Sequence, residues 1–169
     1  MDNLPLHPAI VHLPLGLIIF APILSLLFLF YFKDLVNFKR NWLIVVFLHL
    51  FVMGGALVAK KTGEIEEERV EKIIGHHEIH EHEEKAEFFI VLSIVFFLVS
   101  GAVLAPNKTA VRKGLQYTLL LGQLGLIAVG INVGHSGGEM VFSQGKLNVG
   151  GEIAKPTGQA EEGREDHDD

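Results

Sequence analysis

The stretch LPLHPAIVHLPLGLIIFAPILSLLFLFYF, residues 4–32, contains no Asp, Glu, Lys or Arg. Three later stretches share this property: residues 41–59, 88–107 and 114–138. An α-helix needs about 20 mostly apolar residues to cross the hydrocarbon core of a bilayer, and each stretch contains a run close to that length. Four such helices in a chain of 169 residues would leave too little polar surface to cover them in a soluble protein. The sequence therefore predicts an all-α integral membrane protein, built as a four-helix transmembrane bundle.

The chain divides into a membrane domain and a tail. We expect one transmembrane domain over residues 1–149, with an acidic, His-rich loop outside the membrane after its second helix. Its helices are expected at about residues 8–32, 42–60, 86–105 and 115–135. Residues 150–169 contain Gly, acidic and small polar residues without periodicity, which predicts a disordered acidic tail. Only Asp2 precedes the first helix as a charged residue, so the charged start of a cleaved signal peptide is missing.

The formal charge of −6 is unevenly divided along the chain. The loops after the first and third helices together contain six basic residues and one acidic residue, a net charge of +5, so the rest of the chain carries −11. Both loops lie on the same side of a four-helix bundle. The positive-inside rule places them in the cytoplasm and both termini outside. We therefore expect a protein of the cytoplasmic (inner) membrane with periplasmic termini.

The residue types present limit the chemistry. The chain has no Cys, which excludes disulfides, thiolate zinc sites, thiolate-held iron–sulfur clusters and covalent c-type haem attachment. No HExxH or phosphate-binding loop occurs, and the acidic outer side disfavours nucleic acid. Nine His remain, a large number for this length. Seven of them gather at the outer membrane face, namely His7, His12, His76, His77, His80, His82 and His135.

The first interpretation of this group is a b-type haem. Such a haem needs two axial His from different helices at a similar depth and room for a flat macrocycle, which small residues provide. The expected ligand pairs combine His7 or His12 with His80 or His82, or one of these with His135. The residues that bind the cofactor on this interpretation are His7, His12, His80, His82, His135, Gly16, Gly55 and Gly130. The protein would then be a membrane electron carrier with bis-His ligation near the outer face.

Two alternatives stay open. Helical i,i+4 spacing in the segment before the third helix favours a site for Zn, Cu, Ni or non-haem Fe in a metal-binding or transport protein. Its ligands would come from His12, His76, His77, His80, His82 and His135. The other alternative is a cofactor-free scaffold subunit of a membrane redox complex. His49 lies alone in the middle of the second helix, where we expect a hydrogen bond to a neighbouring helix, for instance to Gln123 or Ser93.

Two motifs resemble those of a known family. Residues 7–16 read HPAIVHLPLG, and residues 134–142 read GHSGGEMVF. Together with Thr62-Gly63, they resemble an uncharacterised bacterial family of predicted four-helix integral membrane proteins, which opens with an HPxxVHFP-type motif and closes with GHxGGxLVYxHG. The resemblance covers about residues 4–146 and matches His7, His12 and His135 to family histidines. Gln144 stands where the closing motif tends to have a second His.

The resemblance implies a four-helix membrane domain with a redox role, because some relatives occur beside c-type cytochrome modules. The partners expected on this basis are the lipid bilayer, a membrane quinol and an outer-face redox protein such as a c-type cytochrome. A second copy of the chain, forming a homodimer, is a further candidate, and nucleic acid is not expected.

Overall fold

The computed structural model describes residues 6–31, 34–71 and 76–142. These residues contain four α-helices and no strand: α1 (Leu6–Tyr31), α2 (Leu35–Glu71), α3 (His76–Ala102) and α4 (Thr109–Phe142). Each is long and apolar enough to cross a membrane. The prediction of an all-α, four-helix integral membrane protein is confirmed. The tail expected over residues 150–169 lies outside the described residues.

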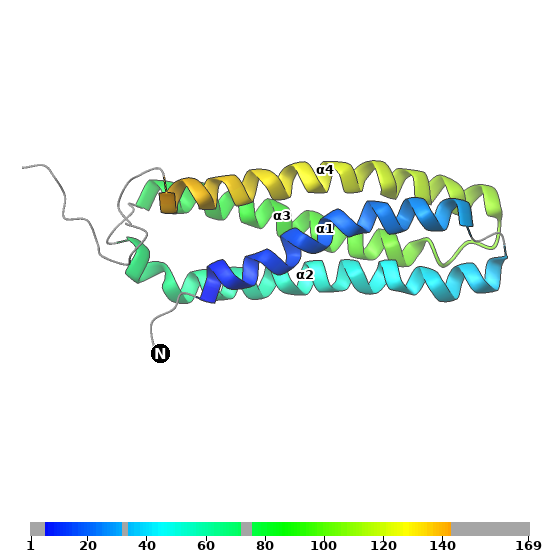
Figure 1. Cartoon of the computed structure of the whole chain (residues 1–169), viewed down its shortest axis with the longest axis horizontal. Helices are drawn as coiled ribbons and strands as arrows, with labels where there is room; N and C mark the ends of the chain where they lie inside the picture. The colour runs from blue at the N-terminus through cyan, green and yellow to red at the C-terminus, as the bar shows by residue number, and fades with distance from the viewer. Residues whose placement is uncertain (1–5, 32–33, 72–75, 143–169) are drawn as a thin grey trace, which may run out of the picture.

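The helices form an up-and-down bundle (Figure 1). α1 packs against α2 and α4, and α3 packs against the same two helices, so α1 and α3 are diagonal to each other. The end of α1, the start of α2 and the α3–α4 connection lie at one end, which we call the basic end because Lys39, Arg40, Lys108, Arg112 and Lys113 lie there. The start of α1, the end of α2, the start of α3 and the end of α4 share the opposite end, the histidine end.

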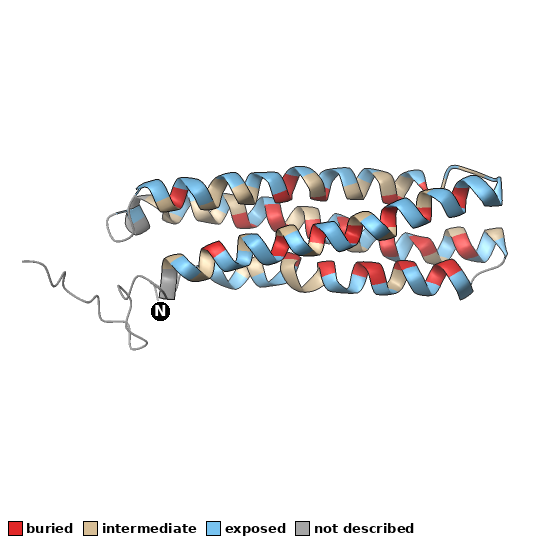
Figure 2. Ribbon diagram, turned by 90° about the horizontal axis from the view of Figure 1, so that it is seen from above, coloured by how far each residue is buried: buried red, intermediate tan, exposed pale blue. Residues whose placement is uncertain are grey.

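Apolar side chains cover much of the outside of the bundle. Figure 2 shows exposed positions along the outer faces of the helices and buried positions facing the interior. Large hydrophobic residues such as Phe30, Phe51 and Leu121 are 60–70% exposed. In water such a surface would be costly, whereas lipid chains solvate it without penalty. The structure thus presents the surface expected of helices that face lipid.

The helices extend further than the uncharged stretches predicted. α2 has 37 residues and spans about 55 Å, whereas the hydrocarbon core is about 30 Å thick. It begins before residue 42 and continues past residue 60 through the charged segment to Glu71. α3 likewise begins at His76 instead of residue 86, and α4 covers Thr109–Phe142 instead of 115–135. Absence of charge locates the part of a helix inside lipid. Its continuation into the polar zone is supported by helix-forming residues and by ion pairs along one helix, such as Lys61–Glu64 and Lys85–Glu81.

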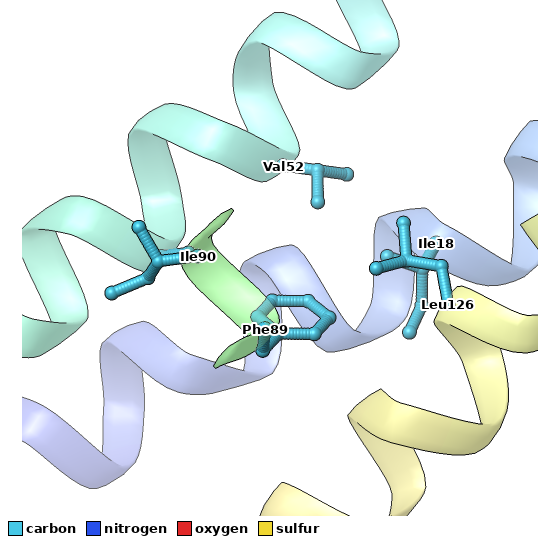
Figure 3. Packing of buried hydrophobic residues seen from close by; sticks show 6 residues of the cluster. Ile18, Val52, Phe89, Ile90 and Leu126 are labelled. Atoms are coloured by element: carbon cyan, nitrogen blue, oxygen red, sulfur yellow. The ribbon is translucent and has the colours of Figure 1, made fainter. Parts of the chain in front are cut away.

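The interior is filled by two apolar clusters with a polar layer between them. The cluster toward the histidine end consists of Ile18, Val52, Ala56, Phe89, Ile90 and Leu126 (Figure 3). The cluster toward the basic end consists of Phe28, Phe38, Trp42, Val45, Val103 and Leu119. Ser25, His49 and Gln123, all buried, come from α1, α2 and α4 and separate them. All four helices contribute to this interior, which fixes their register.

Gly130 allows α4 to approach α1 closely, which yields a first testable prediction. A Cβ at Gly130 would lie 2.5 Å from Cδ1 of the buried Ile18 and 3.3 Å from side-chain atoms of Leu15 and Phe89. Gly130→Ala should therefore lower the free energy of unfolding by about 1–3 kcal/mol through overpacking. Gly16→Ala is the control, because nothing lies within 4 Å of that Cβ.

The measurement is the folded fraction during SDS titration of the protein in mixed micelles, followed by circular dichroism. The control variant should be as stable as the wild type or up to about 1 kcal/mol more stable, because Ala is the better helix former. Equal stability of the wild type and Gly130→Ala would show that α1 and α4 do not pack as closely as described.

Candidate functional site

His7 and His82 meet at the histidine end of the bundle. His7 lies in the first turn of α1, and His82 lies in the second turn of α3. Their ring centres are 6.2 Å apart, and the ring planes are nearly perpendicular at 89°. Because α1 and α3 are diagonal, the two imidazoles approach each other across the axis of the bundle. This is one of the ligand pairs that the sequence analysis proposed.

The imidazole of His7 is held by α2. Its Nδ1 lies 2.7 Å from the carbonyl oxygen of Ala59. A carbonyl can only accept, so Nδ1 carries the proton and donates it. The ring also rests against Gly63, where a Cβ would lie 3.2 Å from Nδ1. A larger residue at position 63 would press on the ring, which gives the Thr62-Gly63 pair of the sequence a structural role.

The imidazole of His82 is held by α4 in the same way. Its Nδ1 lies 2.8 Å from Oγ of Ser136, and that hydroxyl donates its single proton to the carbonyl oxygen of Val133 at 3.0 Å. Oγ must therefore accept, and Nδ1 of His82 is the donor. The ring contacts Gly137 as well, where a Cβ would lie 3.3 Å from Cε1. Ser136 and Gly137 belong to the GHSGG segment.

Both rings thus present the same chemical form. With the proton on Nδ1, the neutral imidazole carries its lone pair on Nε2. Within the described part of the chain, Nε2 of neither ring makes a hydrogen bond. Histidines that bind metals characteristically donate their other ring N–H to a carbonyl or another acceptor, which orients the ring. His7 and His82 are therefore two oriented imidazoles, each with Nε2 available as a ligand.

The helices that hold this pair lie within a region shared with a known family. The chain matches a family model described as Predicted membrane protein (DUF2231) over residues 3–149, most of its length. The chain belongs to this family. No curated protein and no solved structure matches it. Membership confirms the expected resemblance to uncharacterised membrane proteins, and it leaves the activity to be inferred from the site.

The other histidines proposed as ligands lie apart from the His7–His82 pair. His12 is exposed on α1, and its Nδ1 donates to the carbonyl oxygen of Pro8 in its own helix. His135 is 72% exposed and faces Glu139 on its own helix at 3.3 Å. His80 is 62% exposed beside Glu83 and Glu84. His76 and His77 are exposed as well. None of these five contacts the ring of His7 or His82 among the described interactions.

The glycines proposed to make room for a cofactor have other neighbours. A Cβ at Gly55 would lie 3.1 Å from Cδ of Pro14, and the space beside Gly130 is filled by Ile18. These two glycines permit close helix packing, while nothing lies within 4 Å of a Cβ at Gly16. The small residues beside the imidazoles are instead Gly63 and Gly137. These two glycines are not among the cofactor-binding residues predicted from the sequence, although Gly63 belongs to Thr62-Gly63 and Gly137 to the closing motif GHSGGEMVF.

A second His-containing group lies between α2 and α3. Glu67 and Glu71 of α2 line a narrow pocket together with His76, His80 and Glu83 of α3. Over residues 6–31, 34–71 and 76–142, however, no three or more His, Asp or Glu side chains are arranged to hold a metal ion. The structure therefore brings together two imidazoles at one place and acidic residues near it, without a closed set of protein ligands.

The charges around the pair are mainly acidic. Lys60 pairs with Glu87, Lys61 with Glu64 and Lys85 with Glu81. These ion pairs neutralise three of the basic residues at this end. α2 and α3 also carry the carboxylates of Glu66, Glu67, Glu71, Glu78, Glu83 and Glu84. The excess of carboxylates gives the histidine end a negative potential, which attracts cations and basic protein surfaces.

His49 belongs to the polar layer in the middle of the bundle. Its Nδ1 donates to the carbonyl oxygen of Val45, and Nε2 accepts from Nε2 of Gln123 at 3.2 Å. Gln123 donates also to Oγ of Ser25, and the imidazole stacks on the ring of Phe96. The hydrogen bond to Gln123 is one of the two expected from the sequence. Both nitrogens of His49 are thus engaged, which leaves no free ligand atom.

Proposed function

We propose that the protein is a membrane electron carrier that binds a b-type haem between His7 and His82. The observation that carries this proposal is the pair of neighbouring imidazoles, each fixed through Nδ1 and each with an Nε2 that makes no hydrogen bond among the described residues. When bound, haem supplies the one-electron chemistry. His7 and His82 would hold the group, and the protein would also supply the hydrogen bonds that orient them and a site at the edge of the low-dielectric membrane domain.

The spacing of the rings agrees with this ligation. Two imidazoles that hold one metal ion through Nε2, each at about 2 Å, would have ring centres about 6 Å apart. The separation of 6.2 Å between His7 and His82 is compatible with this value.

The number of protein ligands favours haem over a bare ion. Structural zinc sites take four protein ligands, and catalytic ones take three. The described residues offer two imidazoles at this place and no cluster of three ligands. Two are sufficient for haem, because the macrocycle supplies the other four nitrogens to the iron.

The setting suggests what the carrier would exchange electrons with. The positive-inside rule puts the histidine end on the periplasmic side of the inner membrane. A membrane quinol, which gives up two electrons and two protons, would be the reductant, and an outer-face redox protein such as a c-type cytochrome would accept the electrons one at a time. The carboxylates of the histidine end would steer a basic face of that acceptor, an attraction that salt weakens.

The deciding experiment is a reduced-minus-oxidised absorption spectrum of the detergent-purified protein, produced in cells with ample haem. We expect a b-type α band and a stoichiometric haem content. Absence of a Soret band together with bound Zn, Cu or Ni in elemental analysis would replace the proposal with a metal-binding or transport function. Absence of both haem and metal would leave a cofactor-free scaffold subunit.

A further inference from the structure

At the basic end, Arg112 of α4 carries a buried charge that has no counter-charge among the described residues. The residue is 4% exposed, and its Nε and Nη1 atoms have no hydrogen-bond partner. Among the described residues no carboxylate lies within ion-pair distance of its guanidinium. A buried charge without a counter-charge is among the most costly arrangements in a protein, so a group outside the described chain should complete it.

The guanidinium is held in place by an aromatic stack. Its Cζ lies 4.6 Å from the ring centre of Phe38 on α2, and Phe38 in turn stacks on Trp42 at 5.2 Å. An aromatic face satisfies the flat side of a guanidinium and leaves the N–H groups at its edge to bind acceptors. The stack therefore positions Arg112 without using its hydrogen-bond donors.

A second unused donor lies one turn further along α4. Gln116 is 3% exposed, and its Nε2 also lacks a hydrogen-bond partner. Residues four apart share one face of a helix, so Arg112 and Gln116 point into the bundle from adjacent turns. Two buried groups thus have N–H donors without acceptors among the described residues, and a ligand rich in acceptor oxygens would satisfy them.

The surrounding charges indicate whether that ligand is an anion or a cation. Lys39, Arg40, Lys108 and Lys113 lie at the same end, and Asp34 is the only acidic residue there in the described chain. Its Oδ2 accepts from the backbone N–H of Asn37 and caps the start of α2. The basic end therefore attracts anions, and the one carboxylate that the described chain places there already caps α2.

We propose that Arg112 and Gln116 bind a phosphate group, contributed by the head group of an anionic phospholipid. Arg binds phosphate through paired N–H groups, and basic pockets between transmembrane helices recognise lipid head groups. The exposed Tyr31 at the end of α1 and Tyr117 beside Gln116 on α4 are typical of the membrane interface, the depth at which such head groups lie. The alternative source of the same chemistry is free inorganic phosphate.

The test measures the thermal stability of the full chain in lipid-free detergent during titration with three probes: phosphatidylglycerol, phosphatidylcholine and inorganic phosphate. We expect phosphatidylglycerol to raise the melting temperature saturably and phosphatidylcholine to have a much smaller effect. Arg112→Gln should weaken the response to phosphatidylglycerol at least about tenfold, since charge-assisted hydrogen bonds are lost. Lys113→Gln, which removes the same charge from an exposed position, should bind within about twofold of the wild type.

The other possible results distinguish a lipid phosphate from free phosphate, and either of these from the absence of a site. A response to inorganic phosphate as strong as that to phosphatidylglycerol, lost in Arg112→Gln, would keep the phosphate site and overturn the lipid as its source. Equal responses of wild type and Arg112→Gln to every probe would overturn the site. If Arg112→Gln loses helicity, Gln116→Leu takes its place, because it removes the amide donor without a charge; a several-fold weaker response supports the site, and an unchanged one overturns it.

Discussion

Replacing His82 with leucine should abolish the reduced-minus-oxidised absorption bands of the purified protein. His82 supplies one of two oriented Nε2 atoms, and six-coordinate bis-His iron cannot form with one ligand. His7→Leu should have the same effect, because the two rings lie 6.2 Å apart and are separately anchored to α2 and α4. The measurement is the haem content per chain alongside the spectrum.

The matched controls are the exposed histidines of the same helices. His12→Leu removes a ring that bonds only within α1, and His135→Leu removes one that is 72% exposed on α4. Both variants should retain the bands and the haem content of the wild type. Loss of haem in these two variants, with retention in His82→Leu and His7→Leu, would move the ligands to the outer surface of the bundle and refute the site.

The contrast between neighbouring residues explains why sequence alone could not select the pair. His135 and Ser136 are adjacent in the closing motif, yet successive residues of a helix differ by about 100° in direction. Ser136 faces the interior and His135 faces outward. His7 and His12 are likewise about 140° apart around α1. Topology predicted that these histidines share one end of the bundle, and only packing decides which of them face its axis.

The apolar stretches were the strongest part of the prediction. A run such as residues 4–32 can satisfy its backbone hydrogen bonds and keep its apolar side chains out of water as a helix in lipid. The number of helices and the fold class therefore follow directly from these runs. The helix ends do not follow. The charged segment after Ala59 continues α2 to Glu71, outside the hydrocarbon region. Hydropathy does not predict this continuation, because it reports only which residues favour lipid.

The role of the glycines also cannot be predicted from the sequence, for a different reason. The sequence predicts that glycines of α1, α2 and α4 make room for a cofactor, but a Cβ at Gly55 or Gly130 would contact Pro14 or Ile18. Helix packing in membranes uses small residues for the same geometric reason as ligand binding, namely close approach. The two uses differ only in what lies opposite the glycine. That neighbour comes from another helix, so it is not encoded in the local sequence.

Trp42→Ala should be the most destabilising substitution in the apolar interior, lowering the free energy of unfolding by about 3–5 kcal/mol. Trp42 is 0% exposed and packs against Phe38 of its own helix and Phe28 of α1. Its removal leaves a cavity at the basic end that the surrounding helices can fill only partly. The measurement is SDS titration in mixed micelles followed by circular dichroism, because the only Trp is lost as a fluorophore.

The indole N–H makes a second contribution to the free energy of unfolding, which a control variant can separate from that of packing. Nε1 of Trp42 donates to the carbonyl oxygen of Ser100 at 2.9 Å. That carbonyl lies in the last turn of α3, where the N–H of Leu104 bonds to Gly101 instead, so the indole caps a helix end inside the membrane domain. Trp42→Phe keeps most of the volume and loses this bond, so it should cost about 1–2 kcal/mol. If both variants cost the same, the hydrogen bond rather than the packing holds α3 to α2. If neither is destabilising, the basic-end cluster does not form.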